Sequence, residues 1–252
     1  MSVGSAGTLV VVGGWGVRCE MLSELYDDWP GETVLISLDD ALMMACDSVS
    51  DVADALLARY PEPAVWLGWS LGAQVAMAAA ARQTGAVTAV ITVGGFPRFT
   101  AAEGWNSGMP ARDFTHFATG IARAPARHWP RFLRLMVNGD DGERQLRKQL
   151  RPWLEAGAPV SGAYLDKGLA WLRAEDQRAL WMESTTPALH VLGERDAVVR
   201  PWAGWSGIAG CHRAEVIRGM AHWPSGQAAE RCQQMMAAFL EESGGKVQWV
   251  CQ

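Results

Sequence analysis

The sequence predicts an α/β fold in which a mostly parallel sheet is flanked by helices and interrupted by an inserted helical cap. Two observations lead to this prediction. Short apolar runs rich in β-branched residues alternate with helix-like segments over most of the chain, and this alternation stops for more than ninety residues between Val93 and Ala188. About half of the 252 residues are apolar, which is enough to bury the core of one such domain.

The elements of the predicted sheet domain follow in a regular order. Strands are predicted at residues 8–12, 33–38, 64–68, 87–93, 188–192 and 214–217. Helices are predicted at about 17–27, 49–60, 71–83, 201–209 and 225–242. Strands that alternate with helices in this way form a mostly parallel sheet that is covered on both faces.

The interval that breaks this order is predicted to be a helical cap. Its helical pattern runs from about 111 to 183, and a structureless loop of that length is implausible. We therefore divide the chain into a core, residues 1–97 and 186–252, and a cap, residues 98–185. Extra helices that only stabilise the domain are the alternative. A cap over a site is favoured because ligands bind beyond the carboxyl ends of parallel strands.

The strongest functional motif is a nucleophile elbow centred on Ser70. The sequence Gly68-Trp69-Ser70-Leu71-Gly72 matches G-x-S-x-G, with an apolar strand before it and an alanine-rich helix former after it. A sharp strand-to-helix turn projects the serine hydroxyl above the sheet, and small residues two positions away on either side relieve crowding. The helix N-terminus then favours developing negative charge. A glycine-flanked turn without chemistry is the alternative.

An oxyanion hole needs two backbone N–H donors beside the nucleophile. Leu71, the residue after the serine, is predicted to supply one of them. The other is assigned to Trp15, in the turn Gly13-Gly14-Trp15-Gly16 that follows the first strand. Glycines let the backbone approach a substrate closely, although an ordinary tight turn has the same composition.

His222 is the candidate general base. It follows the last predicted strand and precedes the final helix, where a base loop is expected in this chain order. The other histidines fit less well: His116 and His128 lie in the cap, His190 lies inside a strand, and His212 precedes the last strand. A structural or solvated histidine is the alternative for His222.

Asp196 is the candidate acid that orients the base. It lies just past the penultimate strand, whereas the nearby Glu194 is interpreted as a surface charge or an ion-pair partner. The resulting order of serine, aspartate and histidine is that of the α/β-hydrolase fold. The sequence therefore predicts this fold. In the predicted mechanism His222 takes the Ser70 proton, Asp196 fixes the imidazole tautomer, and water hydrolyses the acyl-enzyme.

Several segments carry a more specific resemblance. They are residues 64–72 (Ala-Val-Trp-Leu-Gly-Trp-Ser-Leu-Gly), Gly14-Trp15-Gly16, residues 90–93 and 99–105, Arg131-Phe132-Leu133, residues 193–199 and Ala221-His222. These segments resemble the elbow, the oxyanion loop, the strand leading to the cap, a cap helix facing the acyl chain, and the acid and base loops of the pimeloyl-[acyl-carrier protein] methyl ester esterases of biotin synthesis. The similarity runs over most of the chain.

The resemblance implies a substrate and its contacts. The substrate would be a methyl-capped dicarboxylyl chain held as a thioester on acyl carrier protein, and Trp15, Trp69 and Phe132 would bind it. No cofactor and no metal are expected. Two positions depart from the family pattern, because Gly13 stands where a histidine is usual and Ala73 stands where a third glycine is common.

Basic residues concentrate in the cap. Residues 98–185 carry 13 basic and 10 acidic side chains, a net charge of +3, and the rest of the chain carries −8. Helical spacing places Arg127 and Arg131 on one helix face and Arg144 and Lys148 on another. We expect these four residues to bind the acidic carrier protein. A solvated helix face is the alternative.

Composition and motif content argue against several other classes of protein. The net charge of −5 is unlike that of a nucleic-acid-binding protein. Five scattered cysteines without a C-x-x-C pair argue against a disulfide framework or a zinc site and indicate a reducing compartment. The apolar run at residues 9–12 is too short for a signal peptide or a membrane span. We expect a cytoplasmic protein without a membrane partner, and a monomer.

Two functional alternatives remain open. One is a general short-chain carboxylesterase, thioesterase or C–C hydrolase with the same triad. The other is a non-catalytic α/β-hydrolase that serves as a binding module, against which the complete set of Ser70, Asp196 and His222 argues. Reaction with a fluorophosphonate probe separates the binding module from the enzymes.

Overall fold

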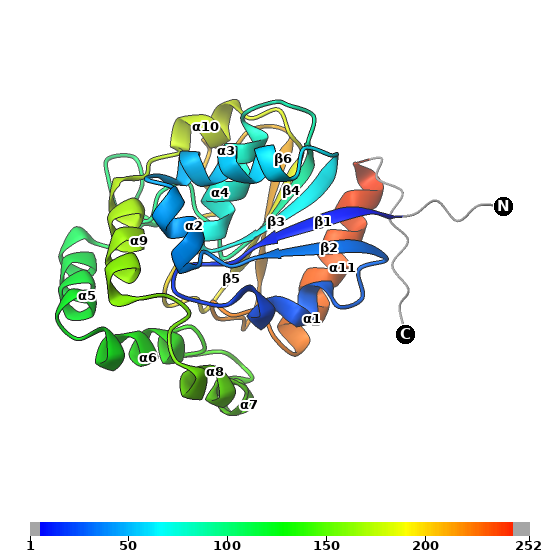
Figure 1. Ribbon diagram of the computed structural model, residues 1–252. Helices are drawn as coiled ribbons and strands as arrows, with labels where there is room; N and C mark the ends of the chain where they lie inside the picture. Colours follow the sequence, from blue (N-terminus) through cyan, green and yellow to red (C-terminus); the bar gives the residue numbers. More distant parts are fainter. Residues whose placement is uncertain (1–5, 244–252) are drawn as a thin grey trace.

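A computed structural model describes residues 6–243 of the chain (Figure 1). Its centre is a six-stranded sheet with the order β2-β1-β3-β4-β5-β6, in which all neighbouring strands are parallel. The strands are β1 Ala6–Val12, β2 Gly31–Ile36, β3 Ala64–Trp69, β4 Val87–Val93, β5 Ala188–Gly193 and β6 His212–Ile217. All six predicted strands are confirmed, and so is the predicted fold class.

The strand order places a crevice between β1 and β3. The chain passes from β1 to β2 on one side and then crosses back to β3 on the other side of β1. In open parallel sheets such a reversal leaves a crevice at the carboxyl ends of the two strands, where ligands bind. The glycine-rich turn after β1 and Ser70 after β3 therefore lie at neighbouring positions.

Helices cover both faces of the sheet. α3 Val49–Arg59 and α4 Leu71–Ala80 lie on one face, and α1 Ser23–Tyr26 and α11 Gln227–Glu242 lie on the other (Figure 1). All residues of α4 are buried, because small side chains let this helix lie directly on β1, β3 and β4 with α3 packed over it. The buried side chains of α3 recur at helical spacing, as the sequence pattern predicts.

The segment between β4 and β5 is helical. Its helices are α5 Ala111–Arg123, α6 Pro125–Leu135, α7 Glu143–Gln149, α8 Arg151–Ala156, α9 Gly162–Ala174 and α10 Arg178–Glu183. Figure 1 shows α5, α6 and α9 beyond the carboxyl end of β1. The two ends of the segment meet, since Gln177 N–H donates to the Pro97 carbonyl at 2.8 Å and Arg98 pairs with Asp176. We use the term cap for residues 98–185.

The prediction of a helix at residues 201–209 is wrong. The segment forms a series of turns, with Trp205 N–H donating to the Trp202 carbonyl at 2.8 Å. Pro201 and the glycines at 204, 207 and 210 disfavour a continuous helix. Trp202 anchors this segment to the core, since its indole N–H donates to the Gly95 carbonyl at 2.9 Å.

Two other helical segments differ from the prediction in detail. Residues 17–27 contain the 3₁₀ helix η1 Cys19–Leu22 followed by the short α1. The helix α2 Asp40–Ala45 was not predicted, and the Asp39 side chain caps it by accepting from Leu42 N–H at 2.9 Å. None of the helices within residues 6–243 is long and apolar enough to cross a membrane.

Candidate active site

Ser70 lies in a strained turn between β3 and α4. Its backbone has φ 56° and ψ −118°, a conformation that residues other than glycine rarely adopt. The Ser70 N–H donates to the Val93 carbonyl at 3.0 Å, which holds the turn against the neighbouring strand. A side chain at Gly68 would overlap the Gly72 carbonyl, so the turn can form only with glycine there. The local geometry is that of the elbow predicted from the sequence.

His222 and Asp196 form a buried pair. The imidazole Nδ1 lies 2.6 Å from Asp196 Oδ2, and the two side chains are 0% and 1% exposed. The other carboxylate oxygen, Oδ1, accepts the backbone N–H groups of Val198 and Val199, each at 2.7 Å. These three hydrogen bonds fix the carboxylate, and the carboxylate in turn fixes the tautomer with a proton on Nδ1.

The free nitrogen of the imidazole has no partner of its own. His222 Nε2 is buried and makes no hydrogen bond within residues 6–243. With Nδ1 protonated, Nε2 is a bare acceptor, which is the state that a general base requires. The ring packs directly against the backbone of Gly94, where φ is +55° and a Cβ atom would come within 2.9 Å of the imidazole.

The oxyanion loop, residues 13–16, contacts the elbow directly. A Cβ atom at Gly14 would lie 3.1 Å from Ser70 Cβ and 3.3 Å from the Trp69 carbonyl oxygen. The backbone N–H groups of Trp15 and Leu71 have no acceptor within residues 6–243. Leu71 is also the first residue of α4, so its N–H contributes to the positive end of the helix dipole. Two backbone N–H groups without an acceptor in the described part of the chain thus belong to the elbow and to the loop that contacts it.

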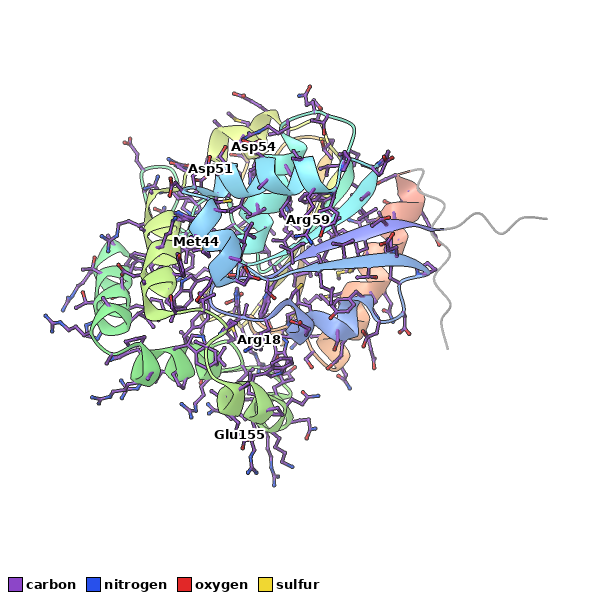
Figure 2. The ribbon with its side chains drawn as sticks, in the orientation of Figure 1. Arg18, Met44, Asp51, Asp54, Arg59 and Glu155 are labelled. Carbon is purple, nitrogen blue, oxygen red and sulfur yellow. The ribbon has the colours of Figure 1, made fainter. Side chains whose placement is uncertain are left out.

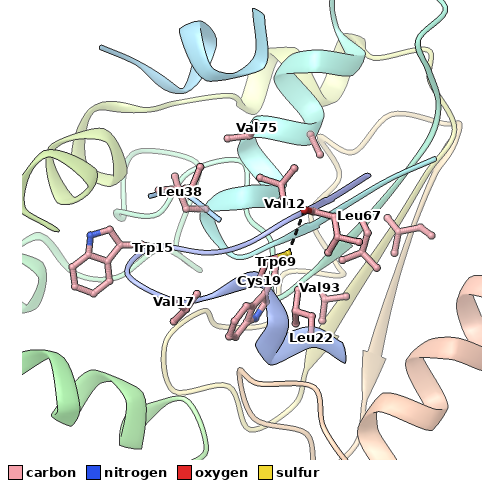
Figure 3. Close-up of a cluster of buried hydrophobic side chains, with 14 of the residues drawn as sticks. Val12, Trp15, Val17, Cys19, Leu22, Leu38, Leu67, Trp69, Val75 and Val93 are labelled. Carbon is pink, nitrogen blue, oxygen red and sulfur yellow. Dashed lines mark hydrogen bonds between the residues drawn. The ribbon is translucent and has the colours of Figure 1, made fainter. Parts of the chain in front are cut away.

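Aromatic rings of the cap pack against Trp15 of the oxyanion loop. Trp15 contacts Phe132 of α6 and Phe117 of α5 edge to face, with ring centroids 4.9 and 5.6 Å apart. Ser70 is only 7% exposed. Figure 3 shows Trp15 at the edge of the buried cluster that includes Val12, Leu67 and Trp69, on the side of the cap. Of the predicted substrate-binding residues, the structure therefore brings Trp15 and Phe132 into contact with each other.

Trp69 occupies a different place from the other two. It is a fully buried residue of the elbow itself, its ring lies 5.8 Å from the His222 ring, and its indole N–H donates to the His222 carbonyl at 3.0 Å. On the opposite side, the His222 N–H donates to the Met136 carbonyl of the cap at 2.9 Å. The backbone of the base is thus held from the core and from the cap at once.

Glu194 does not contact the imidazole. Its Oε2 accepts the Gly219 N–H at 3.0 Å and so supports the loop that leads to His222. Asp140 of the cap supports the same loop, because its Oδ2 accepts the Ala221 N–H at 2.8 Å. Asp196 is therefore the carboxylate in position to orient the base, and Glu194 acts on the backbone.

The buried Cys19 thiol lies near the oxyanion loop but is poorly suited to compete as a nucleophile. It donates to the Val11 carbonyl at 3.3 Å (Figure 3), and burial raises its pKa to about 12. A thiol with that pKa stays protonated and unreactive near neutral pH. The described cysteines, Cys19, Cys46, Cys211 and Cys232, are unpaired, and Cys251 lies outside the described residues. No group of three or more potential metal-ligating side chains occurs within residues 6–243.

The predicted carrier-binding residues lie on the outer surface of the cap. Arg127, Arg131, Arg144 and Lys148 are exposed, and none has an ion-pair partner within residues 6–243. Burial, and then the charges of Arg131 and Arg127, lower the pKa of His128, which lies in the same helix α6 as the two arginines. Their neighbours differ: Arg147 pairs with Glu143, and Arg151 pairs with Glu155, labelled at the outer end of the cap in Figure 2.

Sequence reasoning missed three residues that shape the site. Gly94 underlies the imidazole, Met136 holds the His222 backbone, and Trp129 of α6 donates its indole N–H to the Gly16 carbonyl at 2.6 Å. The pair of glycines that follows β4 is a signal that could have indicated close approach of backbone and side chain. Met136 acts through its backbone carbonyl, a group that every residue has, so the residue type at this position could not have indicated the contact.

Comparison with known proteins agrees with this fold. The model of the family described as "Alpha/beta hydrolase family" matches residues 13–233, and the chain belongs to this family. Among solved structures, an esterase from Exiguobacterium antarcticum superposes with a TM-score of 0.79 at 16% identity, covering 95% of this chain and 93% of that one. A bromoperoxidase from Bacillus anthracis superposes with a TM-score of 0.74 at 17% identity, covering 94% and 93%. These likenesses concern the fold.

Relatives of known name are more specific. A pimeloyl-[acyl-carrier protein] methyl ester esterase of Methylococcus capsulatus is 35% identical, with 76% of this chain and 77% of the relative aligned. A protein of the same name from Edwardsiella ictaluri is 32% identical, with 86% of this chain and 86% of the relative aligned. Another, from Xanthomonas oryzae pv. oryzae, is 30% identical, with 94% of this chain and 96% of the relative aligned. Within the hydrolase family the chain thus groups with these esterases, and it is a carboxylic ester hydrolase.

Proposed function

We propose that the chain is a serine esterase that hydrolyses the methyl ester of pimeloyl-acyl-carrier protein in biotin synthesis. The observation that carries this proposal is the buried His222–Asp196 pair next to the Ser70 elbow. The names of the relatives supply the substrate class. The aromatic rings of Trp15 and Phe132, which contact each other where the cap meets the oxyanion loop, provide an apolar surface that suits a methylene chain.

The first half of the reaction forms an acyl-enzyme. Ser70 Oγ attacks the carbonyl carbon of the methyl ester while its proton passes to His222 Nε2. The negative charge that develops on the carbonyl oxygen is stabilised by the N–H groups of Trp15 and Leu71. The tetrahedral intermediate collapses when the C–O bond to methoxide breaks, and methanol leaves with the proton from Nε2.

The second half releases the acid. Water attacks the acyl-enzyme carbonyl as His222 Nε2 takes one of its protons, and Ser70 Oγ leaves with that proton. The product is a free carboxylate at the distal end of the chain, which remains attached to its carrier as a thioester. Asp196 keeps its negative charge throughout and stabilises the imidazolium.

Selection of the carrier-bound substrate is assigned to the cap. Arg127, Arg131, Arg144 and Lys148 are exposed cations that have no ion-pair partner within residues 6–243, on an otherwise acidic chain, which suits an acidic carrier surface. The cap as a unit, residues 98–185, would position the carrier so that only the acyl arm enters the site. No metal and no cofactor take part in the proposed steps.

Growth without biotin tests the function. A bacterial strain that lacks its pimeloyl-carrier methyl ester esterase should grow on biotin-free medium when it expresses this chain, and should not grow with the Ser70→Ala variant. In vitro, the purified protein should hydrolyse the carrier-linked methyl ester with a higher kcat/KM than a free methyl ester of similar length. Growth failure together with equal rates on both substrates would indicate a general short-chain esterase instead.

A further inference from the structure

Two reciprocal indole hydrogen bonds join the oxyanion loop to the cap. The Trp15 indole N–H donates to the Leu165 carbonyl of α9 at 2.8 Å, and the Trp129 indole N–H donates to the Gly16 carbonyl at 2.6 Å. One bond runs from the loop to the cap and the other from the cap to the loop. In each of the two bonds, the donor and the acceptor are more than a hundred residues apart in the chain.

The loop needs these bonds because its own sequence does not define its shape. Gly14 and Gly16 flank Trp15, and glycines adopt a wide range of backbone angles at little cost. Gly16 has φ +63° and packs so closely that a Cβ atom would lie 2.9 Å from Leu165 Cδ2 and 3.3 Å from Trp129 Nε1. The position of the Trp15 N–H, one residue earlier, therefore depends on contacts from α6 and α9.

The surroundings of Trp129 show that its ring is not held by dense packing on every side. It lines a cavity of about 310 Å³ together with Pro125, Pro130, Leu154, Val160 and Leu165. This cavity gives the ring room on one side, whereas the hydrogen bond to Gly16 fixes its edge on the other. The loss of that bond would therefore release the Gly16 carbonyl without a large change in the core.

We propose that Trp129 is a positioning residue of the esterase, which sets the catalytic rate by holding the Gly16 carbonyl and thereby the Trp15 N–H of the oxyanion hole. The inference rests on the proposed function, because it takes Trp15 as a donor to the reaction's oxyanion. An N–H that is displaced from the developing charge loses most of its stabilising effect, since such donors act only when they are preorganised. Trp129 touches no reacting atom.

The chain offers a matched control in Trp171. Its indole N–H also joins the cap to the core, with α9 as the donor helix and the Asp47 carbonyl as the acceptor at 2.8 Å. Asp47 follows α2 and is not part of the oxyanion loop. Trp129→Phe and Trp171→Phe remove the same kind of bond from the same interface. A general anchoring role of the cap would give the two variants the same effect.

The experiment measures the kinetics of a small soluble ester, p-nitrophenyl butyrate, and inhibition by an alkyl trifluoromethyl ketone. The serine oxygen adds to the ketone carbonyl of this inhibitor and forms an oxyanion that mimics the transition state. Trp129→Phe should lower kcat about tenfold, because removing a donor outright costs about 10²- to 10³-fold. KM should stay within about twofold, and the inhibition constant should rise by the factor by which kcat/KM falls. Trp171→Phe should match the wild type in all three quantities.

A second substitution guards against a damaged fold. Replacing Trp129 by β-(3-benzothienyl)alanine keeps the shape of the ring and substitutes sulfur for the N–H group, so it should reproduce the tenfold loss of kcat at an unchanged melting temperature. Equal effects of Trp129→Phe and Trp171→Phe, or wild-type kcat in the sulfur variant, would overturn the inference. A wild-type protein that neither hydrolyses the ester nor binds the ketone would instead refute the proposed function.

Discussion

His222 Nδ1 donates to Asp196 Oδ2 at 2.6 Å, whereas Glu194, two residues earlier, accepts only a backbone N–H from Gly219. We therefore expect Asp196→Asn to lower kcat by about 10³- to 10⁴-fold, since an amide favours the wrong imidazole tautomer. Glu194→Gln should remain within about tenfold of the wild type, because it changes a loop contact. Steady-state hydrolysis of p-nitrophenyl butyrate ranks the two variants. The reverse ranking would make Glu194 the triad acid.

Removing the nucleophile or the base should abolish turnover without unfolding the protein. Ser70→Ala and His222→Ala should each lower kcat by at least about 10⁴-fold, because the two side chains act as one unit. Circular dichroism should show an unchanged fold for Ser70→Ala, and the fluorophosphonate probe should no longer label it. Esterase activity close to that of the wild type in purified Ser70→Ala would disprove the whole assignment of the active site.

The elbow glycines should be intolerant of any side chain. A Cβ atom at Gly72 would overlap the Val12 carbonyl, and one at Gly68 would overlap the Gly72 carbonyl. Because these contacts involve backbone atoms that cannot move aside, Gly72→Ala should lower the free energy of unfolding by more than about 3 kcal/mol. Gly204→Ala, where a Cβ atom would meet nothing within 4 Å, is the control. Urea denaturation measures both, and a Gly72→Ala variant as stable as the control would contradict the elbow geometry.

Charge reversal on the cap should separate carrier binding from chemistry. Arg127→Glu combined with Arg131→Glu should raise KM for a carrier-linked ester by about tenfold or more and leave kcat on p-nitrophenyl butyrate unchanged. The effect should shrink with added salt, because exposed charges are screened over about 8 Å at physiological ionic strength.

A comparison pair exists on the same cap for this experiment. Arg147 and Arg151 are also exposed but already pair with Glu143 and Glu155, so their conversion to Gln should change KM for the carrier-linked ester much less. Equal losses on both substrates after the reversal of Arg127 and Arg131 would indicate a damaged cap. An unchanged KM for the carrier-linked ester would leave these arginines as a solvated helix face.

Acid should destabilise the fold through a buried pair of histidines. His190 Nδ1 lies 2.8 Å from Thr92 Oγ1, and its Nε2 lies 3.2 Å from His212 Nδ1. Burial lowers the pKa of His190 well below its usual value of 6.5, with a further contribution from the charge of His212, and burial lowers the pKa of His212 to about 4. The unfolded chain therefore binds protons first as the pH falls.

The free energy of unfolding should accordingly fall as the pH drops from about 6.5 towards about 4. Above pH 6.5 the histidine pair should cause no loss of stability, because both histidines are then neutral in the folded and the unfolded chain. Urea denaturation at pH 7.5, 6 and 5 measures this slope. His212→Gln removes one titrating group and should flatten the slope, whereas His116→Gln, at an exposed position in α5, should not. Parallel slopes for the wild type and His212→Gln would show that the pair does not control acid stability.

The sequence was sufficient to predict the sheet and the meeting of Asp196 with His222, because each lies directly after a strand and the ends of parallel strands meet at one edge. It was not sufficient for the segment 201–209. There a helix was predicted, but Pro201 and the glycines leave the backbone in turns, and Trp202 and Trp205 both pack against Trp105 of the cap. Composition alone does not reveal such partners.

The contacts of the cap with the site could not be predicted for a different reason. Trp129 and Gly16 are 113 residues apart, and nothing in the spacing of either segment specifies the other. The hydrogen bond from His222 N–H to Met136 uses a carbonyl oxygen, a group that every residue possesses. Contacts of this kind depend on how α6 lies over the sheet, which only the three-dimensional arrangement defines.

The carbonyl of Met136 limits how this scaffold can be redesigned. It accepts the N–H groups of both His222 and Trp223, at 2.9 and 3.1 Å, while Asp140 accepts that of Ala221. A foreign insert grafted in place of residues 98–185 to change the substrate would leave these three consecutive donors without acceptors, at a cost of about 1–3 kcal/mol for each one that stays buried. Transplanting a new specificity into this hydrolase therefore requires rebuilding the path of residues 219–223 together with the insert.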